Sequence, residues 1–276
     1  MNRKLFFGLF IFPLVIAIGM AVLLCGTVLL THEEESPESL LAAIKTTSPG
    51  KRWQKAFELS NELAKPGSNL RSAPLLHEMT GILQDSHYDP KTRGYMALAL
   101  GHFDSVEAVD ALKKSLSDPE EDVALYAMWS LGSLKARDAV PQITSMLKSE
   151  KSETRKTAVY VLGALGDSSV TSEIKKLLDD PVADVRWNAA LTLARLNDEA
   201  GSGILHEMLD RSKLESGGTM NEAEIEVVMI NATKGLALIQ KPESIKILQS
   251  VSREDKSLKV RQAALEALRY QKTDPS

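Results

Sequence analysis

Residues 184–194 read DVRWNAALTLA, and this stretch decides the fold because its pattern returns along most of the chain. Val185, Ala189 and Leu193 are four residues apart, which places them on one face of a helix. Equivalent leucines, called anchor leucines below, recur every 31 residues at Leu100, Leu131, Leu162 and Leu193. The full triplet returns as Val228, Ala232 and Leu236 and as Val260, Ala264 and Leu268. A fixed period of this length is the signature of a repeat protein.

Each repeat is predicted to be a helical hairpin. A second apolar stretch follows each triplet, for example Val106, Leu112 and Leu116, or Val140, Ile143 and Leu147. Helix starts are expected at Asp89-Pro90, Asp118-Pro119 and Asp180-Pro181. Small residues directly follow the anchor leucines and would let a partner helix approach closely: Gly101, Gly132, Gly163, Ala194 and Ala237. Since one hairpin cannot bury both faces, stacking predicts an all-α, right-handed α-solenoid.

The chain divides into four parts. Residues 1–30 hold an N-terminal stub and an apolar segment, and residues 31–36 form a linker. Residues 37–88 are expected to be degenerate helical repeats that cap the stack, with helices over 37–45, 49–64 and 70–84. Residues 89–276 hold the regular repeats. The spacing between Leu193 and Leu236 is 43 rather than 31 residues, which places an insertion at about residues 210–221.

The apolar segment predicts a membrane anchor. Residues 5–30 carry no charge and are long enough, at about 1.5 Å per residue, to cross a hydrocarbon core of about 30 Å. Arg3 and Lys4 precede the segment and three glutamates follow it, so the N-terminus is expected in the cytoplasm. The repeats would then be periplasmic or extracellular, on a single-pass inner or plasma membrane protein. A cleaved signal peptide and lipidation at Cys25 are the alternatives.

Composition narrows the classes of function. The net charge is −4, aromatic residues make up 5% of the chain, and Cys25 is its single cysteine. A disulfide scaffold and a basic nucleic-acid binder are excluded on these grounds, and no nucleic acid is expected among the partners.

The repeats resemble a known family. Asp184-Val185-Arg186 with Ala189, Ala190, Leu193 and Leu196, and Val260-Arg261 with Ala263, Ala264 and Leu268, look like HEAT repeats of the short type found in phycobilisome bilin-lyase-like proteins. The resemblance covers about residues 89–272 and is specific for fold rather than activity. It implies a structural ladder of arginines with nearby carboxylates: Arg93, Arg155, Arg186 and Arg261 with Asp122 and Asp184. A row of anion-binding arginines is the functional alternative.

No catalytic constellation stands out. Deoxyhypusine hydroxylase, a HEAT-repeat enzyme, holds iron through His-Glu pairs on first helices, but His77-Glu78 and His206-Glu207 fall on second helices far apart in the stack. Ser216-Gly217-Gly218-Thr219 lacks the lysine of a phosphate-binding loop. We therefore expect no catalytic residue, no metal and no cofactor.

The expected function is that of a scaffold or adaptor that binds another protein, anchored to a membrane through residues 5–30. An enzyme of a HEAT-repeat family, bilin-lyase-like or metal-dependent, and a purely structural spacer are the alternatives. The insertion is the candidate partner-binding loop, expected to be mobile, and it is represented by Ser212, Lys213, Leu214, Glu215, Ser216, Gly217, Gly218 and Thr219. A flexible insertion without a function is the alternative.

Overall fold

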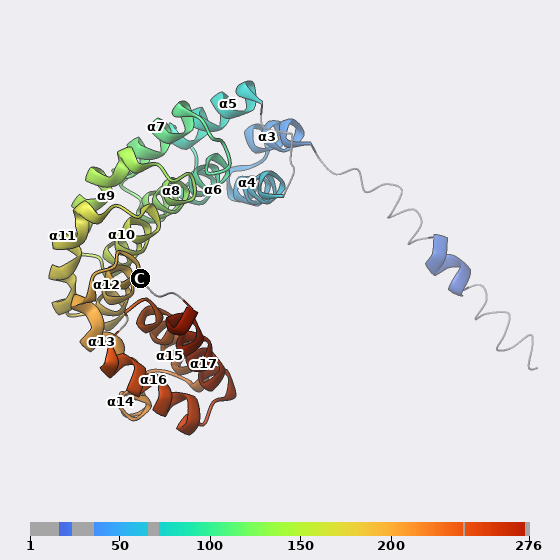
Figure 1. The fold of residues 1–276 in the computed structure, drawn as a ribbon. Helices are drawn as coiled ribbons and strands as arrows, with labels where there is room; N and C mark the ends of the chain where they lie inside the picture. Colours follow the sequence, from blue (N-terminus) through green and yellow to red (C-terminus); the bar gives the residue numbers. More distant parts are fainter. Residues whose placement is uncertain (1–16, 24–35, 66–71, 240, 274–276) are drawn as a thin grey trace, which may run out of the picture.

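The computed structural model describes residues 17–23, 36–65, 72–239 and 241–273, and within these ranges all regular structure is helical. The helices form two curved rows (Figure 1). The inner row contains α4 (Pro49–Ala64), α6 (Pro90–Leu100), α8 (Glu121–Ser133), α10 (Ser152–Leu165), α12 (Ala183–Arg195), α15 (Glu222–Leu238) and α17 (Leu258–Thr273). The outer row contains α3 (Pro37–Thr46), α5 (Ala73–Gln84), α7 (Val106–Ser115), α9 (Val140–Met146), α11 (Thr171–Lys175), α13 (Ser202–Glu207) and α16 (Pro242–Glu254). The predicted all-helical solenoid of stacked hairpins is confirmed.

The anchor leucines form the core, as predicted. Leu100, Leu131, Leu162, Leu193 and Leu236 are fully buried, and Leu268 is partly buried. One cluster of buried side chains extends from α3 to α12, and a second extends from α12 to α17. The two clusters meet at α12, where Ala189 and Leu193 belong to the first and Ala190 and Ala194 to the second.

The glycines after Leu100, Leu131 and Leu162 allow a close approach, but the helix that approaches is the next inner helix rather than the outer helix of the same hairpin. A Cβ atom at Gly101 would lie 2.7 Å from the Ser130 hydroxyl oxygen, and one at Gly163 would lie 2.8 Å from Thr192. The same proximity permits hydrogen bonds between repeats, since the Ser130 hydroxyl donates to the Ala97 carbonyl at 2.8 Å. Thr192 donates likewise to the Val159 carbonyl at 3.2 Å.

Two of the three predicted helix starts are wrong. Asp89 is the N-cap of α6, where its side chain accepts a hydrogen bond from the Thr92 backbone at 3.0 Å. By contrast, α8 and α12 begin three residues after Asp118 and Asp180. These two aspartates bind arginines instead, as described below. Val106 belongs to the apolar stretch that was expected to form a second helix, and it is 78% exposed at the start of α7.

The predicted membrane segment, residues 5–30, lies mostly outside the described residues. Its described portion, residues 17–23, is helical. Across the parts of the chain that the structure describes, none of the helices combines the length and the apolar character needed to span a bilayer.

Ala158 tests the register of the repeats. It is fully buried on α10, so Ala158→Asp would place a carboxylate without a partner between helices. We expect the variant to lose about 3–5 kcal/mol of unfolding free energy in urea denaturation. Ala164→Asp, on the exposed side of the same helix, is the control and should change stability little. Equal stability of the two variants would show that the register is wrong.

Candidate functional site

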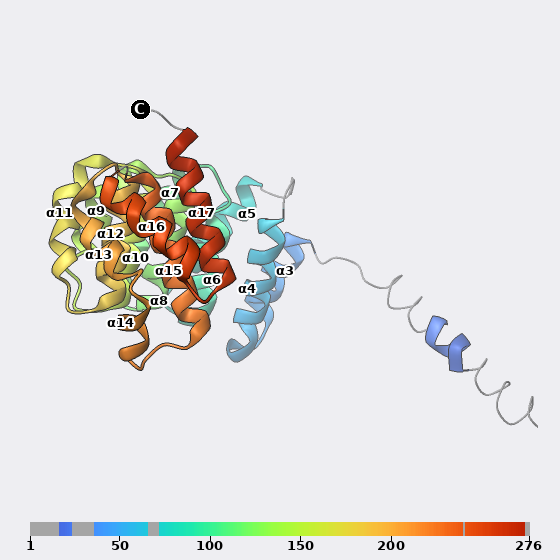
Figure 2. The same cartoon turned by 60° about the horizontal axis from the view of Figure 1, so that its bottom comes forward.

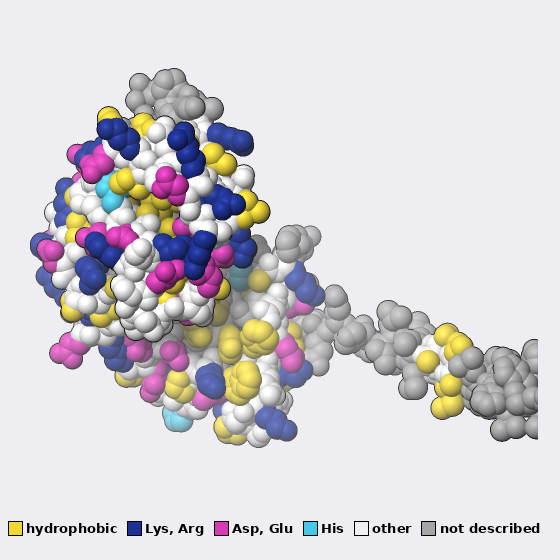
Figure 3. Space-filling view, turned by 90° about the horizontal axis from the view of Figure 1, so that it is seen from below, with side chains coloured by type: hydrophobic (Ala, Val, Ile, Leu, Met, Phe, Trp, Pro, Cys, Tyr) yellow, Lys and Arg dark blue, Asp and Glu magenta, His cyan; other side chains and the backbone are white. Residues whose placement is uncertain are grey.

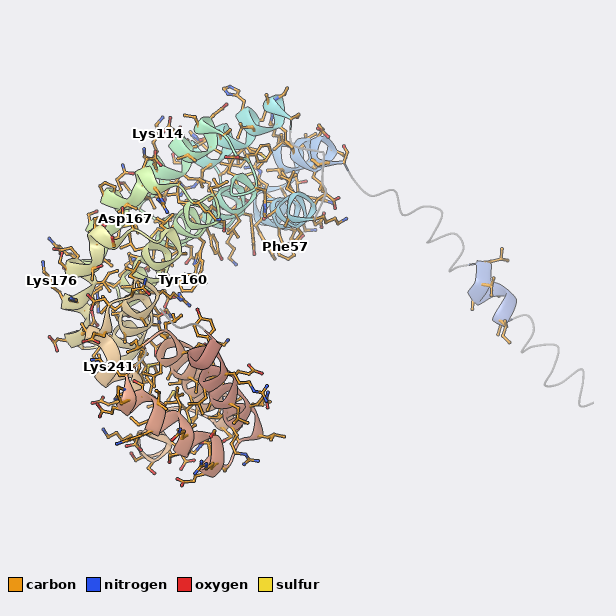
Figure 4. The ribbon with its side chains drawn as sticks, in the orientation of Figure 1. Phe57, Lys114, Tyr160, Asp167, Lys176 and Lys241 are labelled. Carbon is orange, nitrogen blue, oxygen red and sulfur yellow. The ribbon has the colours of Figure 1, made fainter. Side chains whose placement is uncertain are left out.

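A row of aromatic side chains lies on the concave surface formed by the inner helices. We call it the aromatic band, and it consists of Trp53, Phe57, Tyr95, Tyr126, Trp129, Tyr160 and Trp187. Figure 4 shows Phe57 and Tyr160 on the inner side of the arc, whereas Lys114 and Lys176 point outward. In Figure 3 hydrophobic side chains gather on the more distant arm, on the surface that faces the inside of the arc. The band therefore follows the concave face from α4 to α12.

The rings of the band pack against one another from repeat to repeat. Phe57 and Tyr95 meet edge to face with centroids 5.3 Å apart, and Tyr95 stacks on Tyr126 at 6.2 Å. Trp129 and Tyr160 lie 4.8 Å apart. These contacts hold the rings in place while leaving area exposed, since Phe57 is 44% and Trp129 41% accessible. Rigid, partly exposed aromatic rings are typical of binding surfaces.

Gly94 positions one of these rings. A Cβ atom at this residue of α6 would lie 2.5 Å from the Tyr126 ring, so the absence of a side chain leaves room for one edge of that ring. The glycine thus contributes to the band although it carries no contact group of its own.

Two cations of the chain already lie on the band. The Lys91 ammonium is 5.4 Å from the centroid of the Trp53 ring, and the Arg195 guanidinium is 5.4 Å from that of Tyr160. A cation over an aromatic face is attracted by the negative potential of the ring. The surface therefore combines apolar area with rings that attract positive charge.

The band ends in a groove of about 630 Å³. The groove lies against α8, α10, α12 and α15, and the end of the insertion closes one side of it. Its apolar lining is Trp129, Tyr160, Trp187, Leu191, Met208, Met220, Ala223, Val227 and Val228. Its polar lining is Lys156, Thr157, Asp184, Asn188, Thr219, Asn221, Glu224 and Asn231. The volume falls in the range of sites that bind small molecules or side chains of a partner.

The insertion is ordered rather than a mobile loop, so this expectation was wrong. Residues Arg211–Ser216 form helix α14, which Asp210 caps by accepting a hydrogen bond from the Lys213 backbone at 3.2 Å. Leu214 is only 8% exposed and packs in the second hydrophobic cluster. Figure 2 shows α14 at the lower edge of the solenoid, with the following chain returning to α15.

The end of the insertion forms a wall of the groove. Gly218 has a φ of +66°, a left-handed conformation that a side chain would strain, and it turns the chain after α14. Thr219 and Met220 then line the groove. Of the eight predicted loop residues, the structure brings Thr219 to the groove and leaves Ser212 through Gly218 outside its lining.

The arginine ladder has different acidic partners from those expected. Arg93 makes a two-pronged ion pair with Asp118. Arg155 does the same with Asp180, through Nε at 2.7 Å and Nη2 at 2.8 Å. Asp122 and Asp184 are exposed and do not take these places. The correct carboxylates lie four residues earlier, in the turns before α8 and α12.

In the part of the chain that the structure describes, Arg186 and Arg261 bond backbone carbonyls rather than carboxylates. The Arg186 guanidinium donates to the carbonyl of Asp180 at 2.7 Å, and that of Arg261 donates to the carbonyl of Asp255 at 2.7 Å. These bonds satisfy backbone acceptors in the turns between repeats. All four predicted arginines therefore have partners within the protein.

The insertion supplies an arginine that its repeat lacks. Met229 occupies the position on α15 where α6 and α10 carry Arg93 and Arg155. Arg211 of α14 instead makes a two-pronged pair with Asp255, at 2.9 and 2.8 Å, in the turn before α17. Arg211 also reaches Glu222 at 2.8 Å. At this junction the repeat has an apolar residue in place of its arginine but keeps the aspartate in the next turn. Arg211 of the inserted helix pairs with that aspartate and so stabilises the junction.

These ion pairs lower the pKa values of the Asp180 and Asp255 carboxyl groups. Hydrogen bonds from Arg155 lower the pKa of Asp180, against the opposing effect of burial. Burial is the largest influence on Asp255 and raises its pKa, but the hydrogen bonds from Arg211 and from the Ser257 backbone outweigh it and leave the pKa lowered. Both side chains are nearly inaccessible, so each needs its arginine to remain ionised.

Residues of the two His-Glu pairs make separate contacts on the outer helices. His77 on α5 lies 3.1 Å from Glu107, and Glu78 pairs with Lys45. His206 on α13 lies 3.2 Å from the Ser244 hydroxyl. In the described ranges, no three His, Cys, Asp or Glu side chains are close enough together to hold a metal ion.

The geometry defines a class: a curved stack of helical hairpins with an apolar concave surface, the architecture of a repeat scaffold. The family model for HEAT repeats matches residues 78–153, 109–194 and 140–215, which together span half of the chain. The protein belongs to the HEAT repeat family.

Solved structures share the fold. The complex of CpcE and CpcF of phycocyanin lyase from Nostoc sp. PCC7120 is 17% identical with a TM-score of 0.56, covering 87% of this chain and 96% of that one. An engineered protein is 20% identical with a TM-score of 0.52, covering 87% and 69% of the two chains. Human deoxyhypusine hydroxylase gives 20% identity over 86% and 85%, but a TM-score of 0.37. No curated protein sequence matches this chain.

The aromatic band was missed in the sequence although the repeat register contains it. Tyr95 and Tyr126 stand five residues before their anchor leucines, and Trp129 and Tyr160 stand two residues before theirs. Residues three apart share a helix face, so these two positions point the same way on every inner helix. Low overall aromatic content concealed their concentration on one surface.

Arg211→Met tests the brace. It leaves Asp255 buried without its cation, and we expect a loss of about 3 kcal/mol in unfolding free energy. Adding Asp255→Asn to this variant should restore part of the loss, because the remaining amide carries no charge. A single variant as stable as the wild type would show that α14 does not brace the stack.

The lowered pKa of Asp180 predicts acid sensitivity. A carboxyl group whose pKa is lower in the folded state stabilises the fold above its ordinary pKa of about 3.8, and that contribution is lost as the pH falls below this value. Unfolding free energy measured between about pH 6 and about pH 3 should therefore decrease. The decrease should be smaller in the double variant Arg155→Met, Asp180→Asn, and equal slopes would contradict the assignment.

Proposed function

We propose that this HEAT-repeat protein is a non-enzymatic scaffold that binds another protein along its concave surface. The aromatic band carries the proposal, because a spacer that bound nothing would gain no stability from leaving Phe57 and Trp129 partly exposed. The solved Nostoc structure with the same fold is itself a complex of two proteins, which supports a protein partner. An enzyme such as a bilin lyase is the second candidate, and it rests on that likeness of fold alone.

We further propose that residues 5–30 anchor the scaffold in a membrane with the repeats on the outer side. The uncharged length of this segment and the basic residues before it support this arrangement. The short linker of residues 31–36 would keep α3, and with it the end of the arc, close to the bilayer. A partner would then be a membrane protein or a protein at the membrane surface.

The orientation is tested by fusing a reporter that is active only outside the cytoplasm to the C-terminal residue, Ser276. Activity in intact cells is expected. Activity of a matched cytoplasm-only reporter at the same position would contradict both the orientation and the location.

Partner binding is tested by chemical cross-linking in native membranes, followed by purification of the protein with its partner. The double variant Trp129→Ala, Tyr160→Ala removes the centre of the aromatic band, and the yield of cross-linked partner should fall at least about tenfold. Val106→Ala, on the outer row, is the control and should leave the yield unchanged. Circular dichroism must show that both variants are folded. Full retention of the partner by the double variant would contradict binding at the band.

A further inference from the structure

The groove at the end of the aromatic band has features that the rest of the band lacks. It combines Trp187 and Leu191 with the side-chain amides of Asn188 and Asn231 and with two carboxylates, Asp184 and Glu224. Asn188 and Asn231 occupy the same position, five residues before the anchor leucine, on neighbouring inner helices. They therefore stand side by side along the stack.

The charge on the groove is negative. Lys156, the cation in its lining, is paired with Glu153 at 2.7 Å. Within the residues that the structure describes, the Asp184 carboxylate has no ion-pair partner. Glu224 uses one oxygen to accept a hydrogen bond from the Asn221 backbone at 2.7 Å, which leaves the other oxygen available. A ligand that supplies a cation at this end of the groove would complement it.

The main chain of a polypeptide suits the two asparagines. A side-chain amide both donates and accepts hydrogen bonds, as a peptide group does. The Asn188 amide nitrogen donates to the Asp184 carbonyl at 2.8 Å, so its oxygen is left to accept from a ligand. The axes of packed helices lie about 8–10 Å apart, so amides on neighbouring helices can bond peptide groups two to three residues apart in an extended chain. Trp187 and Leu191 would contact the side chains of that segment.

We propose that the groove binds an extended segment of a partner protein in which a lysine or arginine stands beside an aliphatic or aromatic residue. The apolar side chain lies against Trp187 and Leu191, and the cation lies near Asp184 and Glu224. Arg195 on Tyr160 and Lys91 on Trp53 show the same pairing of cation and ring within the chain itself. The inference rests on the proposed function. It assigns the groove to partner segments that carry a basic residue beside an apolar one.

The test uses the full-length protein, residues 1–276, immobilised in detergent solution. Peptides that bind it are selected from a library of random octapeptides. We expect the selected peptides to be enriched at least about tenfold in Lys or Arg next to Leu, Phe or Trp. Trp187→Ala should abolish the enrichment. Trp53→Ala, in the band but outside the groove, shows whether peptides bind elsewhere on the band, and Val106→Ala, on the outer row, is the control that should preserve the enrichment.

Charge is tested with the double variant Asp184→Lys, Glu224→Gln. Glutamine can still accept the hydrogen bond from Asn221, so the start of α15 is kept. We expect the preference for cationic peptides to be lost and peptides with Asp or Glu to be selected instead. Thermal unfolding of each variant must match the wild type to within a few degrees.

Several results would overturn the inference. Selection of the same cationic peptides by the charge variant would show that Asp184 and Glu224 do not determine the preference for cations. Absence of enrichment by the wild type would show that the groove binds no such segment. Loss of selection in Trp53→Ala but not in Trp187→Ala would place peptide binding elsewhere on the band, which contradicts the groove and leaves the proposed scaffold intact. A dimer in sedimentation that Trp187→Ala dissociates would identify a second copy of the chain as the occupant.

Discussion

The close approach of successive inner helices is the constraint on which the rest of the structure depends. At Gly101 and Gly163 the neighbouring side chain occupies the space that a Cβ atom would need. This proximity brings the Ser130 and Thr192 hydroxyls within reach of carbonyls on the preceding helix. It also sets the inner row tightly enough for rings on adjacent repeats to touch, as Tyr95 and Tyr126 do. Packing of the core and presentation of the concave surface therefore follow from the same small residues.

The repeat register explains why the fold was predictable. An anchor leucine every 31 residues, with a small residue after it, specifies an inward stripe and a close contact. The stripe was found where expected, and the close contact is made by the next inner helix. The helices before the regular repeats, such as Pro37–Thr46 and Pro49–Ala64, also matched their predicted ranges closely because proline marks their starts. Local signals suffice where each element repeats or is capped by its own residues.

The site depended on information that is not local. Arg211 and Asp255 are 44 residues apart, and the repeat pattern gives no reason to pair a residue of the insertion with that turn. The polar composition of residues 210–221 suggested a mobile loop. Burial of Leu214 and the ion pair between Arg211 and Asp255 instead hold this segment against the neighbouring helices. The aromatic band could have been found by aligning the repeats on their anchors, since Tyr95, Tyr126, Trp129 and Tyr160 fall at two repeated positions. The groove could not be predicted from the repeat pattern, because Thr219 and Met220 of the insertion form one of its walls.

The meeting of the two hydrophobic clusters at α12 has a consequence for cooperativity. In a stack whose repeats contact only their neighbours, the ends unfold together only if the interface between them is strong. The groove lies over this junction, with Trp129 and Tyr160 on one side and Val227 and Val228 on the other. A molecule seated there touches both halves, so its binding energy is added to the interface that joins them. Occupancy would thereby strengthen the coupling between the two ends of the stack.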